Sequence, residues 1–462
     1  MPPDAKLAPL QQGFYRRLVL LALPITLQTL LFSGKGMLDT LMLASLNETS
    51  VAAAGAASKF LFVATMFLLG LAGGSAQLMA QAYGGWRKQP ATASPLPELL
   101  GRSVQLLFCC ASLLTLLLWL NADVLMLRLC RDAQTAHEAS VFLCIMSLSF
   151  PLFAYTSSVY AVLRTLGQAG MASWFCGLGV VVNVLLNCLL IYGYAGFPAL
   201  GSRGAALGTL ASAVCESLAL LLYLRWRAHA LANFPLLKRA SLQLYRQQLT
   251  LSLQIAANAS LWALGSFCFF AILAAQSATS LVMLALLAPL ESLAMAFLIG
   301  LATSASITIG QTLGAGHAAL AQSQARQALQ LAWFCGVITA ALCYLAKPLV
   351  LLAYPELSTA TRHLFAQVYD LMALSFILKA CALMLLAGIL RAGGDNGFCL
   401  KLDFTAQWLL LLPLTWCLAA YADWGALALF SLGLLEEGLK VALAYWRLQQ
   451  GRWQHRLWQT AH

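Results

Sequence analysis

Residues 70–84 read GLAGGSAQLMAQAYG, and residues 300–314 read GLATSASITIGQTLG. The two stretches share their first three residues, a glutamine at the twelfth position and a closing glycine, and the second begins 230 residues after the first. A second pair of similar stretches follows, LRTLGQAG at 163–170 and LRAGGDNG at 390–397. This internal sequence repeat predicts a fold of two similar halves, with the functional pathway where the two halves meet.

The composition indicates a protein that folds in lipid. Of the 462 residues, 61% are hydrophobic and only 9% are charged, and the mean hydropathy is +0.80. A water-soluble core could not bury this much apolar surface, so lipid must cover much of it. Together with the repeats, this composition predicts an all-α integral membrane transporter.

Apolar windows of about 20 residues, the length of helix that crosses a bilayer, predict about twelve transmembrane helices. Half of them fall in each half of the chain. We expect them near 17–44, 51–80, 100–120, 138–164, 172–194 and 205–226, and then near 249–275, 281–310, 326–353, 364–390, 400–420 and 424–446.

The number of spans predicts how the two halves are related. Six spans return the chain to the side on which it began, so both six-helix lobes share one orientation and are related by a pseudo-two-fold axis along the membrane normal. We predict an N-terminal lobe over 1–230, a cytoplasmic linker over 231–247 and a C-terminal lobe over 248–462, which ends in a short cytoplasmic tail.

The positions of Lys and Arg predict the orientation. With the N-terminus in the cytoplasm, 18 of these residues lie on the inner side and 5 on the outer side. This bias places both termini in the cytoplasm. It also explains the formal net charge of +11, so no nucleic-acid partner is expected.

Charged residues inside spans are candidates for function. Each costs roughly 2.5 to 3.5 kcal/mol at the centre of a bilayer and therefore needs a partner, a water-filled cavity or a role. Asp39 lies late in the first span, where a carboxylate can carry a proton or bind Na⁺. Lys35, four residues earlier on the same helical face, could instead hold it in a static ion pair. The charged residues in spans are Lys35, Asp39, Lys59, Glu216, Glu291, Asp370 and Lys379.

Polar residues in the fifth and sixth spans form a second candidate group. Asn183 and Asn187 lie one helical turn apart in an otherwise apolar segment. Their amide oxygens could join a carboxylate and a hydroxyl such as that of Thr209 in a small cation site. The alternative is that they only hold neighbouring helices together by hydrogen bonds.

Residue patterns typical of an enzyme are missing from the sequence. A membrane enzyme would need paired catalytic acids, or a histidine with a partner near the interface. The six histidines fall in predicted loops or tails, and the thirteen cysteines contain no CxxC pair. We therefore expect neither catalysis, nor disulfides, nor a metal centre.

Several of these motifs occur together in one known family. Asp39 ends the first span, the LRxxG motif follows the fourth and tenth spans, Asn183 and Asn187 lie in the fifth, and GFPALG occupies 196–201. In combination they resemble the multidrug and toxic compound extrusion (MATE) transporters, including their bacterial, NorM-like members. The resemblance covers essentially the whole chain. It implies an antiporter that exports organic, often cationic or amphipathic, compounds while Na⁺ or H⁺ runs inward across the bacterial inner membrane.

The resemblance also implies roles for particular residues. Asp39 would be the coupling residue, together with Asn183, Asn187 and Thr209, and a Na⁺ ion at Asp39 would be the only bound metal. No cofactor is implied. The expected partners are a small organic substrate, the coupling cation and membrane lipid, and we expect a monomer.

Two departures from the family pattern concern the second lobe. Some bacterial members carry a Glu in the seventh helix and an Asp in the tenth, but the seventh span here has no acidic residue, and Lys379 lies near the position of the Asp. Lys379 could supply a tethered positive charge, or could form a structural ion pair with Glu291 or Asp370. A second cation site therefore stays open. Some family members also have an Asp at the position of Asn187, which leaves one carboxylate here instead of two, so the choice of ion stays open as well.

The repeated LRxxG motifs are expected at the cytoplasmic ends of two spans. They contain Arg164 and Gly167 in the first half and Arg391 and Gly394 in the second. We expect the arginines to anchor these helix ends at lipid headgroups and to bond the last backbone carbonyls.

A flippase for lipid-linked precursors is the alternative function. Such a protein shares the two-lobed architecture, but it would favour a strongly basic cavity and often extra helices. Few lysines lie within the spans, so an antiporter is favoured.

Overall fold

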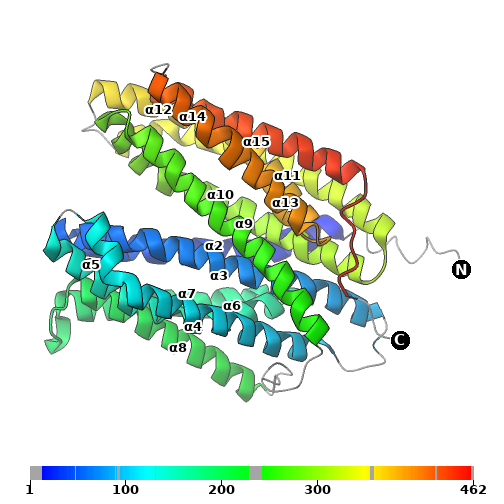
Figure 1. Ribbon diagram of the computed structural model, residues 1–462. Helices are drawn as coiled ribbons and strands as arrows, with labels where there is room; N and C mark the ends of the chain where they lie inside the picture. Colours follow the sequence, from blue (N-terminus) through cyan, green and yellow to red (C-terminus); the bar gives the residue numbers. More distant parts are fainter. Residues whose placement is uncertain are drawn as a thin grey trace, which may run out of the picture. The chain divides into compact units, whose positions relative to one another are not determined.

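The computed structural model describes residues 13–46, 48–88, 90, 94–130, 132–227, 231, 242–353, 358–421 and 424–458. Every regular element within these residues is a helix, which confirms the predicted all-α class (Figure 1). The first half contains α2 (Phe14–Ala44), α3 (Glu48–Lys88), α4 (Leu96–Leu129), α5 (Ala133–Ser147), α6 (Phe150–Thr165), α7 (Ala169–Tyr192), the short η2 (Tyr194–Gly196) and α8 (Ser202–Trp226). The second half contains α9 (Leu242–Ala274), α10 (Ala278–Gly314), α11 (Ala318–Ala353), α12 (Thr359–Leu383), η3 (Met384–Leu390), α13 (Asn396–Phe404), η4 (Thr405–Leu411), α14 (Leu412–Tyr421) and α15 (Ala426–Gln449).

Eleven helical segments of the described chain are long and apolar enough to cross a membrane. The predicted fourth span is divided into α5 and α6 by a turn at Leu148 and Ser149. Pro151 is the second residue of α6 and lies in its first turn, where the missing N–H costs no helical hydrogen bond. The predicted tenth and eleventh spans run through π-helical turns, η3 and η4. The predicted twelfth span is also a helix, α15. It is not counted among the eleven because it contains too many charged residues for an apolar span.

The chain folds into two compact units, and each takes helix ends from the opposite half of the sequence. Unit 1 comprises Met1–Thr26, Ala80–Gln89 and Leu261–His462, and unit 2 comprises Leu27–Met79 and Pro90–Ser260. The boundaries therefore cut α2, α3 and α9. Most of the predicted linker over 231–247, residues 232–241, lies outside the described residues.

The hydrophobic core of each unit includes residues from the opposite half of the sequence. Phe14, Leu18 and Ala22 of α2 are buried among core residues of α9–α15 in unit 1. Ala256 of α9 is buried in the core formed by α2–α8 in unit 2. The ends of α2 and α9 thus bury their apolar faces in the unit opposite to their position in the sequence.

Small residues of the repeated stretches allow these exchanged helices to approach closely. In unit 2, Gly70 of α3 lies against the backbone of Ala256 on α9. In unit 1, Gly300 of α10 lies against Thr26 of α2. Gly300 lies 230 residues after Gly70, and Ala256 lies 230 residues after Thr26. The same contact between equivalent positions therefore occurs once in each unit. Close backbone approach at small residues is a common basis of helix packing in membranes.

A reciprocal contact joins α3 and α10 inside unit 1. Gly84 of α3 lies against the backbone of Gln311, and Gly314 of α10 lies against the backbone of Gln81. A Cβ at either glycine would meet a main-chain carbonyl of the other helix. The repeated motif therefore packs against its own second copy, which explains why glycine and glutamine recur at the same spacing.

The LRxxG motifs form matching helix ends. Gly167 and Gly394 have φ of 79° and 84°, the left-handed conformation that glycine adopts without a Cβ penalty. The Gly167 N–H donates to the carbonyl of Arg164 at 3.0 Å, and the Gly394 N–H donates to that of Arg391 at 2.9 Å. The Arg164 side chain, however, reaches Gln28 of α2, with Nε donating to Oε1 at 3.1 Å, rather than its own helix end as expected.

We predict that adding one methyl group at the α3–α10 contact destabilises the protein. Gly84→Ala and Gly314→Ala should each cost about 1–3 kcal/mol, because each new Cβ meets backbone that cannot move alone. Gly55→Ala is the matched control on α3, since no atom lies near its Cβ position, and it should be neutral or stabilise by up to about 1 kcal/mol. The measurement is thermal unfolding in detergent, and equal midpoints for Gly84→Ala and Gly55→Ala would contradict the packing argument.

Candidate functional site

Four predicted residues from α2, α7 and α8 meet in unit 2. Asn187 Nδ2 donates to Asp39 Oδ1 at 2.5 Å, and the Thr209 hydroxyl donates to Asp39 Oδ2 at 3.0 Å. Asn183 Nδ2 donates to Thr209 Oγ1 at 3.0 Å. Each oxygen of the Asp39 carboxylate thus accepts one hydrogen bond from a neighbouring helix.

Two oxygens in this cluster accept no hydrogen bond. Asn183 and Asn187 are fully buried, and their Oδ1 atoms have no hydrogen-bond partner in the described chain. A buried amide oxygen without a partner costs free energy. With the half-buried Asp39 carboxylate and the Thr209 hydroxyl, these oxygens form a donor set of the kind that hard cations prefer.

The local sequence explains how α7 and α8 bring these groups together. Asn183 and Asn187 share one face of α7 because they are four residues apart. Gly204 and Gly208 of α8 lie against the main chain of Leu190 and the side chain of Asn187. The α7–α8 connection folds back tightly, so that the Leu200 N–H donates to the Leu190 carbonyl at 2.9 Å.

Lys35 has a different partner from the one considered for it. Its Nζ donates to Ser212 Oγ on α8 at 2.8 Å. Within the described residues, no ion pair joins Lys35 to Asp39, so the static pair is not formed in this conformation.

Glu216 of α8 is a further acidic residue next to this cluster, and the sequence analysis assigned it no role. The Tyr160 hydroxyl of α6 donates to its Oε1 at 2.6 Å. Glu216 lies four residues after Ser212 and seven after Thr209, on the same helical face. That spacing relative to Thr209 is the signal by which the sequence could have included it.

The candidate charged residues of the second half form two separate pairs in unit 1. Lys379 Nζ of α12 lies 2.5 Å from Glu291 Oε1 of α10. Asp370 of α12 instead pairs with Lys347 of α11, at 2.6 Å between Nζ and Oδ2. Of the two partners considered for Lys379, the structure selects Glu291.

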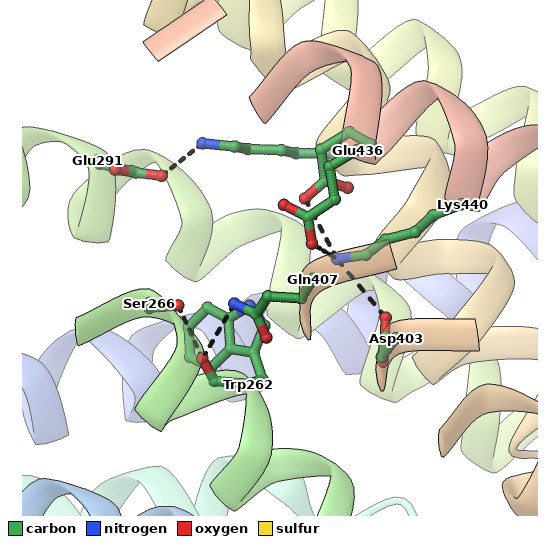
Figure 2. A network of polar contacts seen from close by, with 9 residues as sticks. Trp262, Ser266, Glu291, Asp403, Gln407, Glu436 and Lys440 are labelled. Carbon is green, nitrogen blue, oxygen red and sulfur yellow. Dashed lines mark hydrogen bonds and ion pairs between the residues drawn. The ribbon is translucent and has the colours of Figure 1, made fainter. Parts of the chain in front are cut away.

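Unit 1 also contains a buried charge cluster around Lys440 of α15, which the sequence analysis did not assemble. The Lys440 ammonium lies 2.6 Å from Glu436 and 3.6 Å from Asp403 (Figure 2). It also lies 3.9 Å from Glu437. The spacing of Glu436, Glu437 and Lys440 on one helix predicts their contacts, whereas Asp403 of α13 reaches the cluster only through the fold. Gln407 lies nearby and donates to the carbonyl of Trp262 at 3.3 Å.

Neither unit shows a typical metal centre. No group of three or more His, Cys, Asp or Glu side chains in the described residues is arranged to hold a metal ion. In unit 1 lysine ammonium groups pair with the carboxylates of Glu291, Asp370 and Glu436, whereas in unit 2 no ammonium group pairs with Asp39 among the described residues. The unit 2 cluster is therefore the stronger candidate for exchange of a cation.

Comparison with known proteins identifies the family. The sequence model of the MatE family matches residues 24–189 and 254–417, one segment in each half of the chain. The probable multidrug resistance protein NorM of Pseudomonas syringae pv. tomato is 24% identical over 88% of this chain and 89% of its own length. The multidrug resistance protein MdtK of Yersinia pseudotuberculosis is 26% identical over 86% of both chains.

A solved structure described as MATE in the bent conformation shares the fold. Its TM-score is 0.83 at 16% sequence identity, over 95% of this chain and 96% of the other. The two matched segments together span well over half of the sequence. The chain therefore belongs to the MatE family and is a membrane transporter, not an enzyme.

Proposed function

We propose that this transporter is an antiporter that exports organic, often cationic or amphipathic, compounds in exchange for Na⁺ or H⁺. The observation that carries the proposal is the Asp39 cluster, in which one carboxylate, one hydroxyl and two unpartnered amide oxygens come from three helices. The relatives NorM and MdtK are named multidrug resistance proteins, which supports efflux as the direction of transport. No cofactor is required for this exchange.

The chemistry of the cluster fits either coupling ion. A proton would bind to one Asp39 oxygen, in which case the hydrogen bonds from Asn187 and Thr209 rearrange. A Na⁺ ion would take Asp39, Thr209 and the two amide oxygens as ligands in place of water. Both neutralise a carboxylate whose charge is costly inside a membrane protein.

The cation drives export because it favours one of two alternating states. A ligand shifts such an equilibrium only by the difference between its affinities for the two states. In the proposed cycle the cation enters at Asp39 from outside, and the organic compound enters from the cytoplasm or the inner leaflet. The flippase alternative gains no support from the names of the relatives.

The proposed setting is the bacterial inner membrane, with membrane lipid around a monomer and with both termini in the cytoplasm. The bias of Lys and Arg toward one side of the predicted topology supports this orientation.

We predict that Asp39→Asn abolishes gradient-driven efflux. The substitution keeps the size of the side chain but removes the charge that binds the cation, so efflux should fall by at least about tenfold, the effect of roughly 1.4 kcal/mol. The measurement is efflux of a fluorescent organic cation from proteoliposomes, with Na⁺ and pH gradients imposed separately.

Thr40→Ala is the matched control for Asp39→Asn. Thr40 is the next residue on α2, and its hydroxyl donates to the Gly36 carbonyl of the same helix at 3.0 Å. This variant should transport normally. Efflux by Asp39→Asn at the wild-type rate, or a wild type that responds to neither gradient, would refute the coupling role.

The amide groups should distinguish the two ions. Asn183→Leu removes one candidate ligand oxygen and the hydrogen bond to Thr209, so Na⁺-driven efflux should need about tenfold more Na⁺ for half-maximal rate. A purely H⁺-driven transporter should show a much smaller change. Asn121→Leu on α4 is the control, because Asn121 is exposed and donates to the carbonyl of Leu117 on its own helix.

The orientation can be checked with reporter fusions at the C-terminus. A fluorescent reporter that matures only in the cytoplasm should be bright, and a phosphatase active only in the periplasm should be silent. The opposite pattern would show that the topology is inverted.

A further inference from the structure

A column of polar side chains continues from the Asp39 cluster along α8. Thr209, Ser212 and Glu216 follow the spacing of a single helical face. Each of the three bonds a group on another helix: Thr209 bonds Asp39, Ser212 bonds Lys35, and Glu216 bonds Tyr160. The Asp39 cluster is thus one end of a longer polar arrangement.

Lys35 lies at an intermediate position between two carboxylates. Its ammonium donates to Ser212 of α8. Ser212 lies three residues after Thr209, which bonds Asp39, and four residues before Glu216. Neither carboxylate forms an ion pair with this ammonium among the described residues, so Lys35 is not fixed to either of them. The four-carbon stem of lysine is flexible, so the ammonium can move by about one helical turn, roughly 5.4 Å, while the backbone stays in place.

Glu216 forms no ion pair among the described residues, so Lys35, which Ser212 holds one turn away on α8, is free to turn to it. Tyr160 of α6 donates a neutral hydrogen bond, and on α7 Cys176 is near and Gly179 leaves no room for a Cβ against the carboxylate. Arg164 of α6 is the other cation nearby, and its guanidinium donates to Gln28.

Lys35 can neutralise only one of the two carboxylates, Asp39 and Glu216, at a time. The guanidinium of Arg164 is bonded to Gln28, so Lys35 is the flexible cation on this face of α8. A buried carboxylate without a cation is costly, so a coupling cation at Asp39 would neutralise that residue while Lys35 neutralises Glu216. When that cation leaves, Lys35 becomes the nearest cation available to Asp39.

On the basis of the proposed function, we propose that Lys35 is a tethered counter-ion that alternates between two carboxylates. It neutralises Glu216 while the coupling cation occupies Asp39, and it turns to Asp39 when the cation has left. Glu216 is then a positioning residue, which permits cation binding by drawing Lys35 away from Asp39. Lys35 in turn promotes release, because it competes with the cation for the same carboxylate.

The test is a double-mutant cycle with Lys35→Met and Glu216→Gln. Cation affinity is measured on purified protein from the rise in thermal stability with Na⁺ concentration and with falling pH, and separately from the cation dependence of efflux in proteoliposomes. Glu216→Gln alone should weaken affinity by about tenfold, because Lys35 then has only Asp39 as a carboxylate partner. Lys35→Met alone should tighten affinity by a similar factor and slow turnover.

The decisive comparison is Glu216→Gln in the Lys35→Met background, where it should have almost no effect. Lys35→Arg, which keeps the charge, should restore the dependence on Glu216 and also guards against misfolding of Lys35→Met. Tyr160→Phe removes the hydrogen bond to Glu216 without a change of charge and should leave affinity within about threefold of wild type.

The outcomes separate this inference from the proposed function. If Glu216→Gln weakens affinity equally with and without Lys35, or changes it in neither case, the counter-ion role is wrong, although coupling at Asp39 stands. If the wild type shows no cation dependence and Asp39→Asn changes nothing, both the antiport and the counter-ion role are wrong.

Discussion

The cost of charge and of unpaired polar groups inside a membrane protein is the constraint on which this structure depends. Where lipid replaces water, each embedded polar group needs a partner within the protein. Lys379 meets Glu291, Asp370 meets Lys347, and Lys440 meets three carboxylates, all within unit 1. At Asp39 in unit 2 the same constraint is met differently, because its carboxylate accepts hydrogen bonds from neutral side chains and forms no ion pair among the described residues.

This difference between the units is the reason for which we propose the cation site in unit 2. An ammonium group fixed next to a carboxylate already supplies the positive charge that an exchangeable ion would bring. Lys379 supplies it to Glu291, and Lys440 supplies it in the cluster with Glu436. Lys35 is the one lysine of this kind placed beside the Asp39 cluster, and it bonds a hydroxyl instead of a carboxylate. A lysine in that position can respond to a cation that binds and leaves.

Close packing of small residues is the second basis of the fold. Gly84 against Gln311 and Gly314 against Gln81 bring α3 and α10 together backbone to backbone. Apolar burial does not favour one helix pair over another in lipid, so van der Waals contact at small residues decides which helices pair. The same repeats let the ends of α2 and α9 pack in the unit opposite to their place in the sequence. These glycines take no part in cation binding themselves, but they position the helices that bear the candidate site residues.

The sequence by itself determined the class of fold, the number and approximate position of the helices, and the residues Asp39, Asn183, Asn187 and Thr209 as one candidate group. The length of an apolar segment and the i, i+4 spacing of polar residues are local properties. They predict spans and helix faces without knowledge of the fold. Only the tertiary structure decided the partners: Ser212 and not Asp39 for Lys35, Glu291 and not Asp370 for Lys379, and Asp403 for Lys440. These contacts join helices far apart in the chain, and their geometry depends on how backbones approach at small residues, which no local pattern specifies.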